Sequence, residues 1–262
     1  MAVSLDQILD STRRGLPSLR ARRAALEQEA ESRPQPPSLA HALRQERLGV
    51  VAEVKRRSPS AGVIRDDLDP GGRAALYARS GAAAISVLTD RPHFGGSIED
   101  LRAAASAVTV PLVRKDFILD ELQVIEARAA GAAAVLLIVR ALPPERFTAL
   151  LGCVRSAGLE ALVEVHTPPE LNHALEIGAD IIGVNARDLD TFRIDAATAW
   201  ELLARVPPDR VAVAESGMQS PEDVERAAAA GADAVLVGTA LSAAPDPAGL
   251  LRRFSEVPRR GR

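Results

Sequence analysis

The two lysines of this chain are the residues whose chemistry is most restricted. Among its 32 lysines and arginines, only Lys55 and Lys115 are lysine. Arginine stays charged at any working pH, so it cannot replace a lysine that must donate or accept a proton. Each lysine follows a short apolar run, within Glu53-Val54-Lys55 and Arg114-Lys115-Asp116. This pattern indicates proton transfer by both lysines; their survival by chance is the alternative.

Other polar residues end further apolar runs of the sequence. Because side chains alternate along a strand, five residues are predicted to point toward one centre: Glu53, Lys55, Lys115, Glu164 and Asn185. Burial and pairing shift the pKa values of such a set. Acid–base catalysis needs one group protonated and another not. Structural ion pairs are the alternative interpretation.

Two dipeptides, Ser216-Gly217 and Gly238-Thr239, follow the last two apolar runs. Each offers a hydroxyl group and unhindered backbone N–H groups, which suit a phosphate beside a helix N-terminus. Phe94 and Phe117 stand in predicted loops. They could sandwich a flat aromatic substrate, or they could pack a loop against the core.

Other side chains offer less chemistry. His166 and His173 have no partner at metal-ligand spacing, so we expect surface or loop-packing roles and no metal. Ser216 has no histidine placed to activate it, which argues against a serine nucleophile. Lys115 could instead form a Schiff base, and this remains an alternative mechanism.

An internal repeat positions these residues. Four alanine-rich stretches each end at a glycine that begins a short apolar run: Gly81, Gly131, Gly178 and Gly231. Such a glycine suits a helix C-terminus, and the apolar run suits a strand buried on both faces. Further strands are predicted at Val50–Val54, Pro111–Arg114, Ala161–Val165 and Val211–Glu215. Helical patterns follow the strands at Gly71–Ser80, Ile98–Ser106, Glu121–Ala130, Pro144–Ala157, Pro168–Ile177, Asp195–Ala204, Ser220–Ala230 and Asp246–Phe254.

Eight alternating strands and helices predict an α/β fold, a (β/α)8 TIM barrel in one domain spanning residues 1–262. The active site of such a barrel lies at its mouth, where the strands end, and phosphate often binds after strands 7 and 8. An open doubly wound sheet is the runner-up, but no glycine-rich dinucleotide loop follows the first predicted strand.

Residues 1–45 form a predicted N-terminal helical extension before the first strand. Helices are expected at Leu5–Leu9 and Leu19–Ala30, and Ser32–Ser38 is a proline-rich connector. The extension could cap the barrel bottom, or it could form a lid over the substrate.

Composition excludes several classes of protein. A net charge of −3 gives no electrostatic footprint for nucleic acid or an anionic membrane. No apolar run approaches the roughly 20 residues of a membrane helix, and the N-terminus lacks the pattern of a signal peptide. The single cysteine rules out an internal disulfide. We therefore expect a cytoplasmic protein.

Several segments resemble the signature segments of indole-3-glycerol-phosphate synthases. The most specific are Glu53–Ser60 and Arg114–Ile118, and Phe94–Ser97, Leu162–Val165, Gly183–Leu189 and Ala214–Gly217 match in order and spacing. The resemblance implies a monomeric barrel that needs no cofactor. Its small-molecule substrate would be 1-(2-carboxyphenylamino)-1-deoxyribulose 5-phosphate. Ring closure with loss of CO₂ and water would give indole-3-glycerol phosphate, a step of tryptophan biosynthesis.

The resemblance also implies roles for matching residues. Lys115 resembles the general acid that protonates the substrate's ketone, and Glu164 resembles a base that Glu53 assists in dehydration. Lys55 resembles a second lysine that pairs with Glu53 and attracts a substrate anion. Which lysine serves which proton transfer stays open.

The remaining matching residues would bind the substrate. Asn185 and Ser216 complete the catalytic set, and the other contacts are Ser58 and Arg187 for positioning, Gly217, Gly238 and Thr239 beside Ser216 for the phosphate, and Phe94, Phe117 and Leu189 as walls around the aromatic ring. The family often has lysine where this chain has Ala61, and serine or glutamate where it has Thr239. Two competing hypotheses are another phosphosugar barrel, such as an isomerase or Schiff-base aldolase, and a non-catalytic paralogue.

Overall fold

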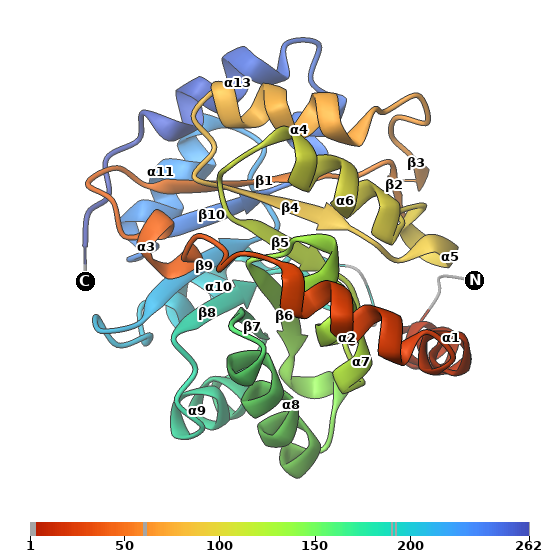
Figure 1. Cartoon of the computed structure of the whole chain (residues 1–262). Coiled ribbons are helices and arrows are strands. Elements are labelled where there is room, and N and C mark those ends of the chain that lie inside the picture. The colour runs from red at the N-terminus through yellow and green to blue at the C-terminus, as the bar shows by residue number, and fades with distance from the viewer. Residues whose placement is uncertain (1–3, 60–61, 190, 192, 262) are drawn as a thin grey trace.

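Eight parallel strands close into a barrel in this computed structural model, which describes residues 4–59, 62–189, 191 and 193–261. Strands that follow one another in sequence are neighbours in the barrel, and the last strand pairs with the first (Figure 1). The strands are β1 Gly49–Val54, β4 Ala84–Leu88, β5 Leu112–Lys115, β6 Ala134–Ile138, β7 Glu160–Val165, β8 Ile181–Asn185, β9 Val211–Glu215 and β10 Ala234–Val237. The predicted barrel is confirmed, and the open sheet is excluded.

Eight helices follow the strands at the predicted positions. They are α4 Pro70–Arg79, α6 Ile98–Ala107, α7 Glu121–Ala130, α8 Pro144–Ser156, α9 Pro168–Glu176, α10 Ala196–Leu203, α11 Pro221–Ala229 and α13 Pro247–Ser255. Several begin at a capping side chain followed by proline, as at Ser220 and Pro221. The four repeat glycines have positive φ angles, between 72° at Gly178 and 102° at Gly81, which confirms their predicted left-handed conformation.

The shorter elements were not predicted, because too few residues form each one to show a periodic pattern. They are α3 Leu39–Leu43, α5 Arg91–Phe94, α12 Thr239–Ala243, the 3₁₀ turn η1 Val139–Ala141, and the hairpin of β2 Arg57–Ser58 and β3 Gly62–Val63. All except α3 follow the end of a barrel strand, so they shape the mouth.

Each barrel strand buries alternate residues on two faces. Val51, Val113, Leu162 and Val213 belong to an inner cluster with residues of other strands. Their sequence neighbours, such as Val163, pack instead in the larger cluster with the surrounding helices. The inner parity continues along each strand into its last residues, so it decides which polar side chains reach the mouth.

The N-terminal extension contacts both ends of the barrel. In α1 Leu5–Arg20, the side chains of Leu5, Ile8 and Leu9 pack in a cluster with Phe117, which follows β5 at the mouth. The side chain of Leu43, in α3, packs near Gly49 at the start of β1. Figure 1 shows α3 and α1 on opposite sides of the strands. The two predicted placements, bottom and mouth, are each occupied by a different helix.

One helix boundary in the extension was predicted wrongly. Residues 10–18 lie inside α1, which runs through Pro17 and continues after a short break as α2 Arg23–Ser32. A proline within a helix removes one backbone hydrogen bond. Pro17 lies on the exposed side of α1, so the carbonyl group that it leaves unpaired can face water. Among the described residues, no helix combines the length and apolarity needed to cross a membrane.

Candidate active site

A pocket opens at the mouth of the barrel. Its lining includes all fourteen residues predicted to form the site: Glu53, Lys55, Ser58, Phe94, Lys115, Phe117, Glu164, Asn185, Arg187, Leu189, Ser216, Gly217, Gly238 and Thr239. They come from seven of the eight barrel strands or from the loops that follow them. Alternation predicted that five of them, Glu53, Lys55, Lys115, Glu164 and Asn185, point into the mouth, and all five line the pocket. Ser60, which ends the first signature segment, and Ala61, which follows it, lie outside the described residues.

Lys115 lies between two buried carboxylates. Its Nζ is 3.1 Å from Glu164 Oε2 and 3.1 Å from Glu215 Oε2. The Lys115 side chain is 14% exposed, whereas those of Glu164 and Glu215 are 1% and 2% exposed. Lys115 is the last residue of β5 and Glu215 is the last residue of β9, and Glu164 is one residue before the end of β7. One ammonium group therefore serves two carboxylates from different strands.

This arrangement moves the pKa values of the three groups in different directions. Burial lowers the pKa of Lys115, but Glu164, Glu215 and Glu53 outweigh burial and raise it above its ordinary value. Burial also raises the pKa of Glu164, but the charges of Lys115 and His166 outweigh it and lower the value to about 2. Glu215 has a pKa raised to about 8, chiefly by burial and also by repulsion from Glu164. Near neutral pH, Glu164 is ionised and Glu215 retains its proton.

Glu215 was missing from the predicted site, although the sequence held the signal for it. Val213 faces the barrel interior, so its alternate neighbour Glu215 has the same parity. Glu215 directly precedes the Ser216-Gly217 dipeptide, to which the prediction at this strand end was confined. A Cβ atom at Gly183 would collide with Glu215 Oε1, so glycine on β8 leaves the space that the carboxylate occupies.

Glu53 and Lys55 form a second ion pair, both from the β1 segment. Lys55 Nζ lies 2.9 Å from Glu53 Oε1, as the resemblance implied, and the two side chains are 13% and 6% exposed. Gly238 lies against this pair, since a Cβ atom there would be 2.8 Å from Lys55 Nζ. The phosphate-type dipeptide after β10 therefore adjoins the Lys55 charge.

The loop after β9 has an unusual backbone conformation. Ser216 is the one non-glycine residue with a positive φ angle in the described chain, at 67°, and Gly217 follows at 82°. Non-glycine residues adopt this conformation at an energetic cost, which often marks a functional site. Thr239 is the first residue of α12, which follows the neighbouring strand β10. The two dipeptides thus present hydroxyl and backbone N–H groups to the same pocket.

An apolar wall lies opposite, built by Phe94 and Phe117. Their ring centroids are 6.2 Å apart with planes tilted by 39°. Both rings line the pocket beside Leu189, and Phe117 also packs in the inner core cluster. The loop-packing role is therefore confirmed for Phe117, and contact of the two rings with a flat ligand stays a prediction.

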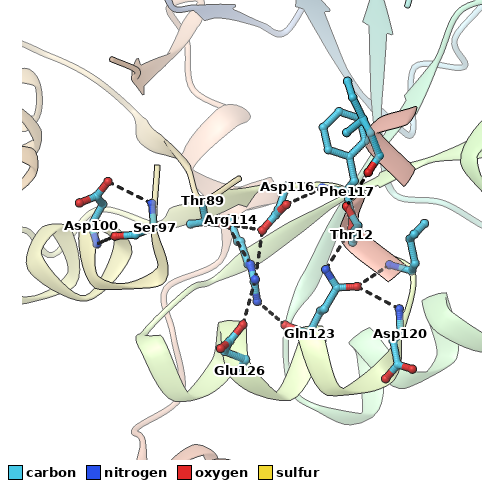
Figure 2. A network of polar contacts seen from close by, with 12 residues as sticks. Thr12, Thr89, Ser97, Asp100, Arg114, Asp116, Phe117, Asp120, Gln123 and Glu126 are labelled. Atoms are coloured by element: carbon cyan, nitrogen blue, oxygen red, sulfur yellow. Dashed lines mark hydrogen bonds and ion pairs between the residues drawn. The ribbon is translucent and has the colours of Figure 1, made fainter. Parts of the chain in front are cut away.

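A buried polar network holds the end of β5, which carries Lys115, and the loop that follows it. Figure 2 shows Arg114 between Asp116 and Glu126, with Nη2 3.1 Å from Asp116 Oδ2 and 2.9 Å from Glu126 Oε2. Gln123 Nε2 donates to the Phe117 carbonyl at 3.0 Å. Gln123 and Glu126 belong to α7, so these contacts tie the pocket residues Lys115 and Phe117 to that helix.

His166 lies closer to the site than the sequence indicated. Its side chain is 5% exposed, and its Nε2 is 3.4 Å from Glu164 Oε1. The expected surface or loop-packing role misses this contact, although His166 lies two residues after Glu164 and so shares its inward parity. The described residues contain no group of three or more histidine, cysteine or acidic side chains placed to hold a metal ion.

Comparison with known proteins identifies the family. The family model for indole-3-glycerol phosphate synthase matches residues 5–254. A protein of that name from Parafrankia sp. (strain EAN1pec) is 48% identical over 247 residues, covering 93% of this chain and 92% of that protein. Another from Nocardioides sp. (strain ATCC BAA-499 / JS614) is 53% identical over 208 residues, covering 79% and 80%.

Solved structures agree on the fold alone. A thiamine phosphate pyrophosphorylase from Pyrococcus furiosus superposes with a TM-score of 0.59 at 17% identity, covering 81% of this chain and 95% of that one. That identity is too low to carry function, whereas the family match spans most of the chain. The chain belongs to the indole-3-glycerol phosphate synthase family.

Proposed function

We propose that this enzyme closes the indole ring of 1-(2-carboxyphenylamino)-1-deoxyribulose 5-phosphate, with Lys115 as the general acid. Family membership supports the overall reaction, which forms indole-3-glycerol phosphate with loss of CO₂ and water. The observation that carries the residue assignment is Lys115 Nζ, 3.1 Å from each of two buried carboxylates at the pocket. An ammonium held in this way is charged before the substrate arrives.

Ring closure needs a proton for the ketone oxygen as the aromatic carbon attacks. The raised pKa of Lys115 keeps Nζ protonated before ring closure, so that a proton is available to the ketone oxygen. The same shift argues against a Schiff-base aldolase, because a nucleophilic lysine must lose its proton and depends on a lowered pKa. Glu215, which retains a proton near neutral pH, is placed to return one to Lys115.

The later steps need a base and a further acid. Glu164 is ionised and faces the pocket, so it can accept the proton that leaves as the ring becomes aromatic. Glu53, which pairs with Lys55 in the same pocket, would assist loss of the hydroxyl group as water.

The walls of the pocket suit the two ends of the substrate. We assign the phosphate to the Ser216-Gly217 and Gly238-Thr239 backbones, and the aromatic ring to Phe94, Phe117 and Leu189. Ser58, Asn185 and Arg187 line the space between and would position the substrate's polar groups. The apolar wall and the anion site lie in one pocket, as an aromatic phosphosugar requires.

The decisive experiment is an assay with this substrate and purified protein, following the absorbance and fluorescence of the indole product. We expect turnover by the wild-type chain and a loss of at least about 10²-fold in Lys115→Met, the scale of a removed general acid. Wild-type turnover in a folded Lys115→Met protein would refute the assignment. Absence of turnover in the folded wild-type chain would favour a non-catalytic paralogue.

We further propose that one domain of residues 1–262 acts as a monomer in the cytoplasm, with the N-terminal extension as part of that domain. Support for a monomer comes from the surface, where Val63 and Ile194 are the only large hydrophobic side chains that are exposed in the described chain. Light scattering after size-exclusion chromatography tests the oligomeric state, and a mass twice that of the 27.7 kDa chain would refute it.

A further inference from the structure

Behind Glu164 lies a row of buried polar side chains that the proposed reaction does not use. The row runs from Glu164 through His166 and Glu170 to Arg140, outward from β7 to the first turn of α9 and to η1. None of the four side chains is more than 21% exposed. Removing four ionisable groups from water is costly unless each is paired, and here each group contacts the next one in the row.

His166 lies between two carboxylates. Its Nε2 is 3.4 Å from Glu164 Oε1, and its Nδ1 is 3.4 Å from Glu170 Oε2. Glu164 Oε1 and both ring nitrogens are sealed from solvent, and none of the three makes a regular hydrogen bond within the described chain. The contacts of Glu164 are therefore divided, with Oε2 facing Lys115 and Oε1 facing His166.

Glu170 is itself held in place on the far side of the imidazole. Its Oε1 accepts hydrogen bonds from Arg140 Nε at 3.1 Å and Nη2 at 2.9 Å. Its Oε2 accepts the backbone N–H of His166 at 2.7 Å. The residue also sits in the first turn of α9, which Thr167 caps. Glu170 is thus a fixed acceptor that can orient the imidazole through Nδ1.

We propose that His166 is a positioning residue for Glu164, and that Glu170 and Arg140 orient its imidazole. The Nε2–H group holds Oε1, which leaves Oε2 directed at Lys115 and the substrate. Without this contact the carboxylate can rotate, and its buried Oε1 loses its polar neighbour. This inference rests on the proposed role of Glu164 as a base.

The arrangement has a consequence for the pH dependence of turnover. Lys115 from β5, Asn185 from β8, Glu215 from β9 and His166 face Glu164. Glu164 and Glu170 face His166, and Glu170 is paired in turn with Arg140. Removing the His166 donor raises the pKa of Glu164, since a stabilising partner of the carboxylate is lost. A base acts when ionised, so the acidic fall in kcat/KM then moves to higher pH.

Two similar amides separate positioning from packing. In His166→Gln the amide nitrogen can reach the position of Nε2, whereas in His166→Asn it reaches only that of Nδ1. We expect His166→Asn and His166→Leu to lower kcat by about 10-fold or more, because the buried Glu164 Oε1 then has no polar neighbour at the position of Nε2. KM changes little because His166 is absent from the pocket lining. His166→Gln should recover most of the turnover, and the acidic limb should move upward in Asn and Leu only.

The control is Glu164→Gln, assayed with thermal unfolding of every variant. Wild-type kcat and pH profile in His166→Leu, beside an inactive Glu164→Gln, would overturn this inference and leave the proposed function intact. Equal losses in the Gln and Asn variants with an unmoved acidic limb would reduce His166 to a packing residue and overturn it as well. Full turnover in Glu164→Gln would refute the proposed role of Glu164, and the inference with it.

Discussion

Lys55 and Lys115 lie in the same pocket, but their partners come from different distances along the chain. Lys55, which directly follows β1, pairs with Glu53 two residues before it. Lys115 pairs with Glu164 and Glu215, which are 49 and 100 residues away on other strands. The first pair needs only two residues that are two positions apart and point the same way. The second cluster forms only once the barrel has closed.

The difference also separates the charge balance of the two sites. The Glu53–Lys55 pair joins one cation to one anion, whereas Lys115 is shared by two carboxylates. Sharing leaves one carboxylate that retains a proton near neutral pH, and that carboxylate is Glu215. The Lys115 cluster is therefore suited to moving protons, and the Lys55 pair, beside Gly238, is suited to attracting the substrate's anionic groups.

The largest expected effect comes from matched arginine variants. Lys115→Arg keeps the charge but removes the transferable proton, so we expect kcat to fall at least about 10²-fold. Lys55→Arg keeps the electrostatic role, so its kcat should stay within about 10-fold and KM should change more. Steady-state kinetics of both proteins test this. Equal losses of kcat would mean that both lysines transfer protons and would remove the distinction.

Two glycines allow each cluster to be crowded separately. Gly183→Ala places a Cβ atom in the space of the Glu215 carboxylate, and Gly238→Ala places one against Glu53 and Lys55. Overpacking costs about 1–3 kcal/mol, so both variants should melt several degrees lower. We expect Gly183→Ala to lower kcat and Gly238→Ala to raise KM. If both variants change the same constant, the two clusters do not act separately.

Glu215 and Glu164 should contribute to stability in opposite pH ranges. The pKa of Glu215 is raised to about 8, so the folded state binds its proton more tightly, and stability falls as pH rises from about 4.5 to 8. The slope for one proton is at most about 1.4 kcal/mol per pH unit. Glu215→Gln should remove that slope, as measured by urea unfolding at several pH values. An unchanged slope would refute the protonated state.

Glu164 provides the internal comparison for that experiment. Its pKa is lowered to about 2, so its stabilising effect is present above about pH 4.5 and is lost as pH falls toward 2. Glu164→Gln should therefore change the pH dependence of unfolding only in this acidic range. A change confined to the range of Glu215 would mean that the two carboxylates exchange roles.

The smallest expected effect is at the phosphate dipeptides. Thr239→Ala removes one hydroxyl at the start of α12, and we expect KM to rise about 5-fold while kcat stays nearly unchanged. Thr239→Ser, which keeps the hydroxyl, is the matched control and should behave like the wild type. A loss confined to kcat would contradict a phosphate-binding role.

Local patterns were enough to predict the barrel. The repeat that ends each helix at a glycine and starts a buried strand is written in consecutive residues, so periodicity located the strands and eight helices. The same local reasoning was wrong for residues 10–18. Gly15 and Pro17 disfavour a helix locally. Packing of Leu5, Ile8 and Leu9 at one end and Leu19 at the other overrides that preference.

The pocket residues were predictable for a similar reason. Alternation along a strand determines which side chains face inward. It applies equally to Glu215, which the predicted site did not include. His166 shares the parity of Glu164, but parity alone does not show that its imidazole contacts Glu164 Oε1 and Glu170. The direction of a side chain beyond a regular element is decided by the groups packed around it.

By itself, the sequence determined that both lysines stand at strand ends and share the inward parity of Glu53, Glu164 and Asn185. Those properties depend only on residue type and on spacing of one or two residues. Only the tertiary structure decided that Lys115 serves two carboxylates and that Glu215 keeps the proton. Pairing and burial depend on distances across the closed barrel, and those distances are absent from any local pattern.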